Sequence, residues 1–308
     1  MPWTHLRATA EAGTDSIYLE GPDFPKWDVG DEIVIASSSY DPYEAEVRTI
    51  TSITAGNITI NEPLQHTHKV FWMIPPEDIA GSQIEDGVRM SPEVGLLTRN
   101  IVVQGGDSDE EPLEYHHYGC RVLIGQYSYE NFEFTGQAHF DSVEFRYCGQ
   151  GGYFAPHDPR YSIAFKDMSD GSRSSYIRRC SIHHGYNTAI GVHRSNGVVV
   201  EDNVIYRTTD SSVKIGGSGN IASHNLAMLT STIQPNQPKD NHAVDFPATY
   251  DVDATNELKY NVAAGSTRIG VRFAGEVCGV DQTVTEDSVC QCILQLIAMN
   301  VSVLSDCV

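Results

Sequence analysis

The sequence predicts an all-β protein whose larger part is wound into a parallel β-helix. Short apolar or β-branched runs follow one another along the chain, separated by glycine and proline. No stretch keeps the period of an amphipathic helix. In the middle of the chain the runs recur about every 22 residues. Such a period is typical of a solenoid whose coils each hold two or three short strands.

The first 106 residues are expected to form a β domain. The runs in this region are DSIYLEG, DEIVIASS, AEVRTITSIT, NITINEPL and NIVVQG. Turn-forming residues such as Gly30, Pro42 and Pro63 separate them. The acidic stretch DSDEEPLE at 107–114 is expected to be a solvated loop.

The repeat is clearest where YIRRCSIHHG, VVVEDNVIYR and NIASHNLAML are written under one another. Cys180, Asn203 and Asn225 then share a column, and Ile182 and Ile205 share another. Leucine-rich repeats have a similar length, but their leucine pattern is absent here. Strand, turn and strand within each period fit a coil of a parallel β-helix better.

Residues one period apart lie on neighbouring coils, about 4.8 Å apart. We therefore expect Cys180, Asn203 and Asn225 to point inward at one turn, where the asparagine amides bond the neighbouring backbone. Asn261, in KYNVAAG, would continue this column after an insertion at 230–256. An earlier coil is expected at 139–149.

Outward positions follow from the same alternation. If Cys180 and Ile182 point inward, then Arg179, Ser181 and His183 point outward, with Asp202 above Arg179. One interpretation is a surface ladder with an Arg179–Asp202 ion pair. The other is a basic groove that grips a sulfated or uronic acid chain, whose candidate residues are Arg173, Arg178, Arg179, His183 and His184. Arg160 is also a candidate ligand-binding residue, although a role in fixing a turn through loop carbonyls is favoured over an anion clamp.

The net charge of −21 repels nucleic acid and anionic membranes. The sequence predicts no cofactor, although calcium is kept as a candidate ligand of Asp86, Glu93 and the acidic loop at 107–114. No EF-hand spacing is present. The seven cysteines are odd in number and irregularly spaced, so they indicate neither a disulfide framework nor a zinc site.

Targeting signals are weak. The N-terminus lacks the apolar core of a signal peptide, and no apolar run is long enough for a membrane helix. Asn57 and Asn300 lie in sequons and are candidate glycosylation sites. No nucleophile elbow or phosphate loop is present. Glu201 and Asp202 are neighbours on one strand and therefore make a poor glycosidase pair.

Several longer segments resemble the fibrocystin and fibrocystin-L family. They are DVGDEIVIASSSYDPYEAE, DGVRMSPEVGLLTRNIVVQG, YCGQGGYFAPHDPRYSIAF, SSYIRRCSIHHGYNTAIGV and AGSTRIGVRFAGEVCG. The resemblance implies an eight-glycine β domain at 1–106, N-terminally incomplete, packed on a right-handed parallel β-helix at 107–279. Residues 280–308 would be a divergent tail, either disordered or an artefact of the gene model.

The family also suggests a function. Its members are cell-surface proteins, which implies a non-enzymatic, structural or ligand-binding module with a glycan or protein partner at the cell surface or outside the cell. The alternative is hyaluronan depolymerisation, because a related hyaluronidase branch shares both domains. That branch carries a Tyr-Pro-(Ile/Val)-His-(Phe/Trp)-His motif, for which this chain has Arg160–Phe165 without histidine. The missing histidines favour the non-enzymatic interpretation.

Overall fold

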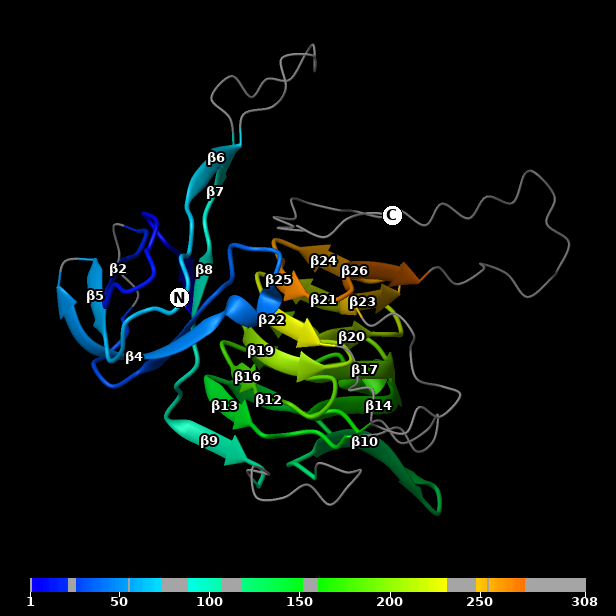
Figure 1. Cartoon of the computed structure of the whole chain (residues 1–308). Coiled ribbons are helices and arrows are strands. Elements are labelled where there is room, and N and C mark those ends of the chain that lie inside the picture. The colour runs from blue at the N-terminus through cyan, green and yellow to red at the C-terminus, as the bar shows by residue number, and fades with distance from the viewer. Residues whose placement is uncertain are drawn as a thin grey trace, which may run out of the picture.

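The computed structural model describes residues 2–21, 26–54, 56–73, 88–106, 118–151, 160–231, 248–253 and 255–274. Within these ranges the chain forms 26 strands and two short 3-10 turns, η1 (Pro42–Glu44) and η2 (Asp170–Ser172). Figure 1 shows two parts: an N-terminal domain, in blue and cyan, and a stack of coils that runs from green to orange. The all-β class and the β-helix expected from the sequence are therefore confirmed.

The N-terminal domain is a six-stranded antiparallel sheet with the order β1-β8-β3-β4-β5-β2. A separate antiparallel pair, β6 and β7, forms an arm. Leu6, Ile17, Ile33, Ile50 and Ile58 are fully buried in the core of the domain. The strands are β1 (Trp3–His5), β2 (Ser16–Tyr18), β3 (Glu32–Ile35), β4 (Glu46–Thr54), β5 (Asn57–Ile60), β6 (Phe71–Met73), β7 (Val88–Met90) and β8 (Glu93–Leu96).

The β-helix has three parallel sheets, and each full coil gives one strand to each sheet. The covered sheet contains β9 (Ile101–Gln104), β13 (Val143–Arg146), β16 (Ser181–His183), β19 (Val204–Thr209), β22 (Leu226–Ser231) and β25 (Val262–Ser266). The charged sheet contains β10 (Val122–Tyr129), β14 (Ile163–Ser169), β17 (Ile190–Ser195), β20 (Val213–Ile215), β23 (Ala248–Asp253) and β26 (Ile269–Ala274). The third sheet contains β12 (His139–Asp141), β15 (Tyr176–Arg178), β18 (Val199–Glu201), β21 (Ile221–Ser223) and β24 (Glu257–Lys259). At its edge, the charged sheet continues into β11 (Phe132–Thr135), which is antiparallel to β10.

Two segment limits differ from those expected from the sequence. Strand β9 pairs in parallel with β13, so the helix begins before residue 107. Strand β23 pairs in parallel with β20, although the sequence placed residues 230–256 in an insertion. The error arose because the repeat from Asn225 to Asn261 is 36 residues long, and β23 is hidden in that long period.

Inward side chains stack in columns along the helix. Ile182 of β16 pairs with Ile205 of β19, and Ile205 pairs with Ala227 of β22. The polar column begins at the buried Cys180, whose backbone N–H donates to Asn203 Oδ1 (2.9 Å). Further along, Asn203 Nδ2 donates to Asn225 Oδ1 (2.9 Å), and Asn225 Nδ2 to Asn261 Oδ1 (2.8 Å). Each of these asparagines is fully buried, so the ladder satisfies amides that would otherwise cost free energy.

The residue before each member of this column has a left-handed backbone. The φ angles are 52° at Arg179, 56° at Asp202, 54° at His224 and 52° at Tyr260. Residues other than glycine and asparagine rarely adopt this conformation. The stacked coils therefore impose a sharp corner that the residue types themselves do not indicate.

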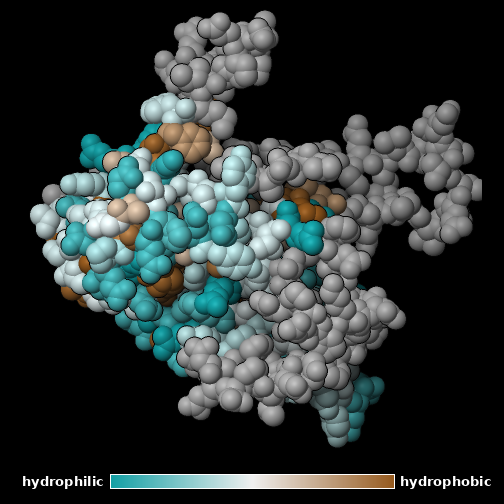
Figure 2. All heavy atoms as spheres, viewed as in Figure 1, coloured by the Kyte–Doolittle hydropathy of each residue, from teal (hydrophilic) through white to brown (hydrophobic). Residues whose placement is uncertain are grey.

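A third apolar cluster joins the N-terminal domain to the outer side of the covered sheet. Its members are Trp3, Val34, Ala36 and Leu97 from the domain, and Val204, Tyr206, Leu226, Met228, Leu229, Val262 and Ala264 from the helix. A Cβ at Gly95 would lie 2.7 Å from Val204 Cγ1, so only glycine permits this close approach. Trp3 also stacks on the His224 ring, with centroids 4.7 Å apart, and its Nε1 donates to the His224 carbonyl. The side chains of the N-terminal domain that reach the surface are mostly hydrophilic in Figure 2.

This junction corrects the expected exposure of two residues. Ser181 and His183 point away from the coil interior, yet both are buried, because the N-terminal domain lies over them. The Ser181 hydroxyl donates to the Leu97 carbonyl of the domain. An outward position is therefore not an exposed one on this sheet.

The cysteines also depart from the sequence interpretation. Cys120 and Cys148 lie on neighbouring coils and form a disulfide. Cys180 is the free cysteine of the described residues and is buried. The spacing could not show this pair, since the partners meet through the stacking of coils.

Candidate functional site

The arginines expected to form a basic groove are each paired with a carboxylate. Arg179 binds Asp141 of the preceding coil through both oxygens, and not Asp202 as the column alignment suggested. Asp202 instead receives His224 Nδ1 at 2.5 Å. Asp202 is thereby occupied by the next coil, and Arg179 pairs with the carboxylate of the coil before it.

The remaining candidate cations are similarly dispersed. Arg178 lies 3.2 Å from Glu201, and Arg173 lies 2.7 Å from Asp170. Arg160 is buried and donates to the Gly151 carbonyl (3.3 Å), which is the contact of a residue that fixes a turn. Each of these side chains thus has a partner of its own within the chain.

His183 and His184 belong to a network beneath the domain junction. Glu144 Oε1 lies 3.4 Å from His183 Nε2 and 3.5 Å from Arg146 Nη1. The backbone N–H of Arg99 donates to Glu144 Oε2 (3.0 Å). The Nδ1 atoms of His183 and His184 are 2.8 Å apart and share a hydrogen bond. The network thus connects Arg99, which lies between the N-terminal domain and the helix, with two neighbouring coils, those of β13 and β16.

Burial shapes the charges of this network. It would raise the pKa of Glu144, but hydrogen bonds from His183 and from the Arg99 N–H outweigh it and hold that pKa below the ordinary value. Burial, followed by the charges of His183, Arg207 and Arg146, lowers the pKa of His184 to about 3. The network is buried between the domain and the coils, although His183 Nε2 is left with only the 3.4 Å contact to Glu144. A buried network of this kind suits a structural joint better than a site that exchanges protons with a ligand.

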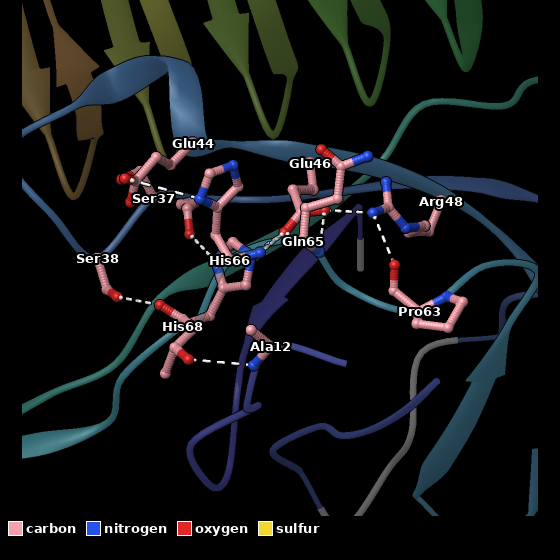
Figure 3. A network of polar contacts seen from close by, with 12 residues as sticks. Ala12, Ser37, Ser38, Glu44, Glu46, Arg48, Pro63, Gln65, His66 and His68 are labelled. Atoms are coloured by element: carbon pink, nitrogen blue, oxygen red, sulfur yellow. Dashed lines mark hydrogen bonds and ion pairs between the residues drawn. The ribbon is translucent and has the colours of Figure 1, made fainter. Parts of the chain in front are cut away.

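A second buried network holds the N-terminal domain together. Figure 3 shows the Glu46 carboxylate accepting from the backbone N–H groups of Gln65 (2.9 Å) and His66 (2.8 Å). His68 Nε2 lies 3.2 Å from the same carboxylate, and Arg48 pairs with it. Because every partner belongs to one sheet and its adjoining loop, this network fixes the loop onto β4.

A third group of charges lies on the outer side of the charged sheet. Lys214, Asp251 and Arg272 occupy one register on β20, β23 and β26. Asp251 accepts from Arg272 Nε (2.9 Å) and lies 3.7 Å from Lys214 Nζ. Nearby, Asp210 accepts from the Thr188 hydroxyl (3.1 Å), and burial raises the pKa of Asp210. The sequence analysis missed this group, although alternation in VKI and YDV was a usable signal.

Strand β14 contains the positions at which the hyaluronidase branch carries its histidine motif. In this chain these positions lie on the same outer side of the charged sheet. Ile163 and Phe165 are fully buried inside the coil, so the outward residues are Ala164 and Lys166. The apolar positions of the motif must point inward, which aligns it with Tyr161–Lys166, one residue later than expected from the sequence. Its histidine positions are then Ala164 and Lys166. Lys166 pairs in register with His193 of β17.

Three further expectations concern metals and glycans. No group of three or more His, Cys, Asp or Glu in the described part of the chain could hold a metal ion. Glu93 is buried, and burial raises its pKa to about 7; Asp86 and the loop at 107–114 lie outside the described residues. Asn57 is half-buried and its side-chain oxygen accepts from Ser16, while Asn300 lies outside the described residues.

No helix among the described residues is long and apolar enough to cross a membrane.

Comparisons with known proteins relate the chain to parts of much longer proteins. A model of the CEMIP β-helix family matches residues 130–297. Fibrocystin-L of Mus musculus is 34% identical over 284 residues, covering 89% of this chain and 6% of the relative. Cell surface hyaluronidase CEMIP2 of Homo sapiens is 27% identical over 291 residues, covering 82% of this chain and 19% of the relative. The chain thus spans only a small part of either relative.

Among solved structures, the tailspike protein gp49 from Pseudomonas phage LKA1 matches with a TM-score of 0.23 and 10% identity. The match covers 84% of this chain and 38% of that chain. A likeness of this size supports no functional argument.

Proposed function

The chain belongs to the CEMIP β-helix family, and from that premise we propose that it is a non-catalytic, ligand-binding module of a fibrocystin-L-like protein that acts at the cell surface. The observation that carries this proposal is on β14. Where the hyaluronidase branch has two outward histidines, this chain has Ala164 and Lys166. Alanine has no group that could transfer a proton, so the first of the two histidine positions has no acid or base in this chain.

The other titratable groups support the same proposal. Glu144 and His183 contact each other beneath the domain junction, and the exposed arginines are held in ion pairs. Arg178 and Arg179 are proposed as secondary contacts for the ligand, because exposed ion pairs are weak enough to be exchanged. Arg173 has the same property. Glycans on Asn57 and Asn300 would fit an extracellular location.

The test uses protein secreted from a eukaryotic host. High-molecular-mass hyaluronan is incubated with the chain, with and without calcium, and its length is followed by chromatography. We expect the length to stay unchanged. Shortening of the polymer that disappears in His193→Ala would refute the proposal and assign catalysis to the charged sheet.

Hyaluronan depolymerisation remains the second candidate, since one outer side holds two carboxyl groups with different environments. Asp251 is held by Arg272 and Lys214, whereas burial raises the pKa of Asp210. Acid and base pairs in glycosidases are tuned apart in this manner. The hyaluronan experiment decides between the two functions, and Asp210→Asn is its second loss-of-function variant.

A further inference from the structure

The β10–β11 hairpin extends beyond the stacked coils and carries an unusual surface (Figure 1). Four aromatic residues on it are exposed: Tyr127 (63%), Tyr129 (57%), Phe132 (65%) and Phe134 (57%). Apolar side chains with this exposure cost free energy in water, and a cluster of them marks an interaction surface.

The register places all four rings on one side of the hairpin. Tyr127 pairs with Phe134, and Tyr129 pairs with Phe132. Directly opposed residues of antiparallel strands point to the same side, as do residues two apart on one strand. The opposite side carries Gln126 with Thr135, and Ser128 with Glu133. We name the four rings the aromatic platform.

The aromatic platform continues the outer side of the charged sheet. Ile124 of β10 is buried in the coil core, so Leu123, Tyr127 and Tyr129 share the outward parity. Leu123 lies in register with Ala164 of β14, next to the small residue Gly191 of β17. Both of these small residues are buried, and the Tyr161 ring lies against Gly191, so the exposed surface of the platform ends at Leu123.

We propose that the aromatic platform binds a neutral polysaccharide chain, which names the ligand class of the module proposed above and rests on that proposal. Sugar rings present weakly positive C–H groups that stack on the negative face of an aromatic ring. The two tyrosine hydroxyls supply donors and acceptors for sugar hydroxyls at the rim. Four rings on one side of a hairpin suit an extended polymer, which can contact several of them at once.

Area and charge favour this ligand over a protein or a membrane. Four partly exposed rings offer about 400–600 Å² of contact, below the roughly 800 Å² per partner of a stable protein complex. Two copies of the chain would each carry a net charge of −21 and would repel one another. The same charge opposes anionic lipid and acidic polysaccharide, whereas a neutral glycan pays no such penalty.

The test is affinity electrophoresis of the whole chain through gels that contain a neutral polysaccharide, either a mixed-linkage β-glucan or a galactomannan. We expect retardation of the wild type by at least one of them, and at least tenfold weaker binding by Tyr127→Ser combined with Phe134→Ser. The matched control is Tyr40→Ser, which removes another exposed tyrosine, 77% exposed, from the N-terminal domain. It should bind like the wild type.

Each other outcome overturns the proposal. These outcomes are no retardation by either glucan or galactomannan, equal loss in Tyr40→Ser, or a hairpin-dependent dimer in sedimentation. Binding to phosphatidylcholine vesicles that the double variant abolishes would assign the platform to membranes instead. Since the hyaluronan experiment measures cleavage, a non-catalytic module that fails to bind neutral glycan is distinguishable from an enzyme. Circular dichroism of the double variant confirms that the coils remain folded.

Discussion

The covered and charged sheets are built from the same coils but differ on their outer sides. In β19, Val204, Ile205 and Tyr206 are all buried. In β20, one turn further along the same coil, the inward Val213 and Ile215 are buried while Lys214 between them is partly exposed. Inward residues are alike in both, because each must fill the coil. The outward residue alone decides whether a sheet becomes a domain junction or a surface available to ligands.

The comparison predicts the largest effect for an apolar truncation at the junction. Leu226→Ala should lower the free energy of unfolding by about 2–5 kcal/mol, because it opens a cavity between the domain and the covered sheet. Lys214→Ala on the charged sheet should cost less than about 1 kcal/mol, since its ion pair is partly exposed. Chemical denaturation measures both. Equal losses of unfolding free energy in the two variants would mean that the junction stabilises the protein no more than a surface ion pair does.

A buried carboxylate should matter more than an exposed one, though less than the apolar junction. Glu144→Gln should destabilise the protein by about 1–3 kcal/mol, because His183 and the Arg99 N–H lose a charged partner. The folded-state pKa of Glu144 is lowered, so this stabilisation is present above the unfolded pKa near 4.5 and is lost as pH falls through the folded value.

Denaturation at pH 7 and at pH 3 measures that difference. The difference in unfolding free energy between the wild type and Glu144→Gln should be smaller at pH 3 than at pH 7. Glu201→Gln, which alters the exposed pair with Arg178, serves as control and should change stability by less than about 1 kcal/mol. A gap that widens at low pH would contradict the assignment of charge to Glu144.

The smallest effect concerns His184 at the edge of the junction network. Its pKa is about 3 in the folded protein, against 6.5 for the unfolded chain, so the unfolded state takes up a proton first. Stability is unaffected above pH 6.5 and should fall by about 1–2 kcal/mol between pH 7 and pH 5 through this residue. His184→Phe should show a flatter profile than the wild type. His139→Gln, which removes an exposed histidine, is the control, and an equally flat profile in it would contradict the assignment to His184.

Much of the helix could be predicted from its repeat, while its surroundings could not. The spacing of Asn203 and Asn225 predicts which residues stack, since stacking follows from the period alone. Whether a stacked residue is exposed depends on another domain, and this is why Ser181 and His183 were misjudged. The apolar outward residues Val204 and Tyr206 were the available signal of a covered sheet.

The candidate site was less predictable, for physical reasons. Arg179 was expected to meet Asp202, but it binds Asp141 of the preceding coil instead, and stacking alone does not say which of two neighbouring coils a long side chain contacts. Lys214 and Asp251 are separated by 37 positions because of a long period, so no fixed repeat aligns them. The Cys120–Cys148 disulfide likewise depends on which coils are neighbours. The corners of the coils and the unequal lengths of the periods cannot be predicted from a pattern of alternating apolar residues.

The contact between Trp3 and His224 joins residues that are 221 positions apart. A ribosome adds about 5–20 residues per second, so Trp3 emerges roughly ten seconds or more before His224, and Leu97 roughly five seconds or more before Val204. During this interval Trp3, Val34 and Leu97 have no partner from the covered sheet. Synthesis therefore passes through a state with an exposed apolar face, and chaperone binding during translation is expected to be strongest there.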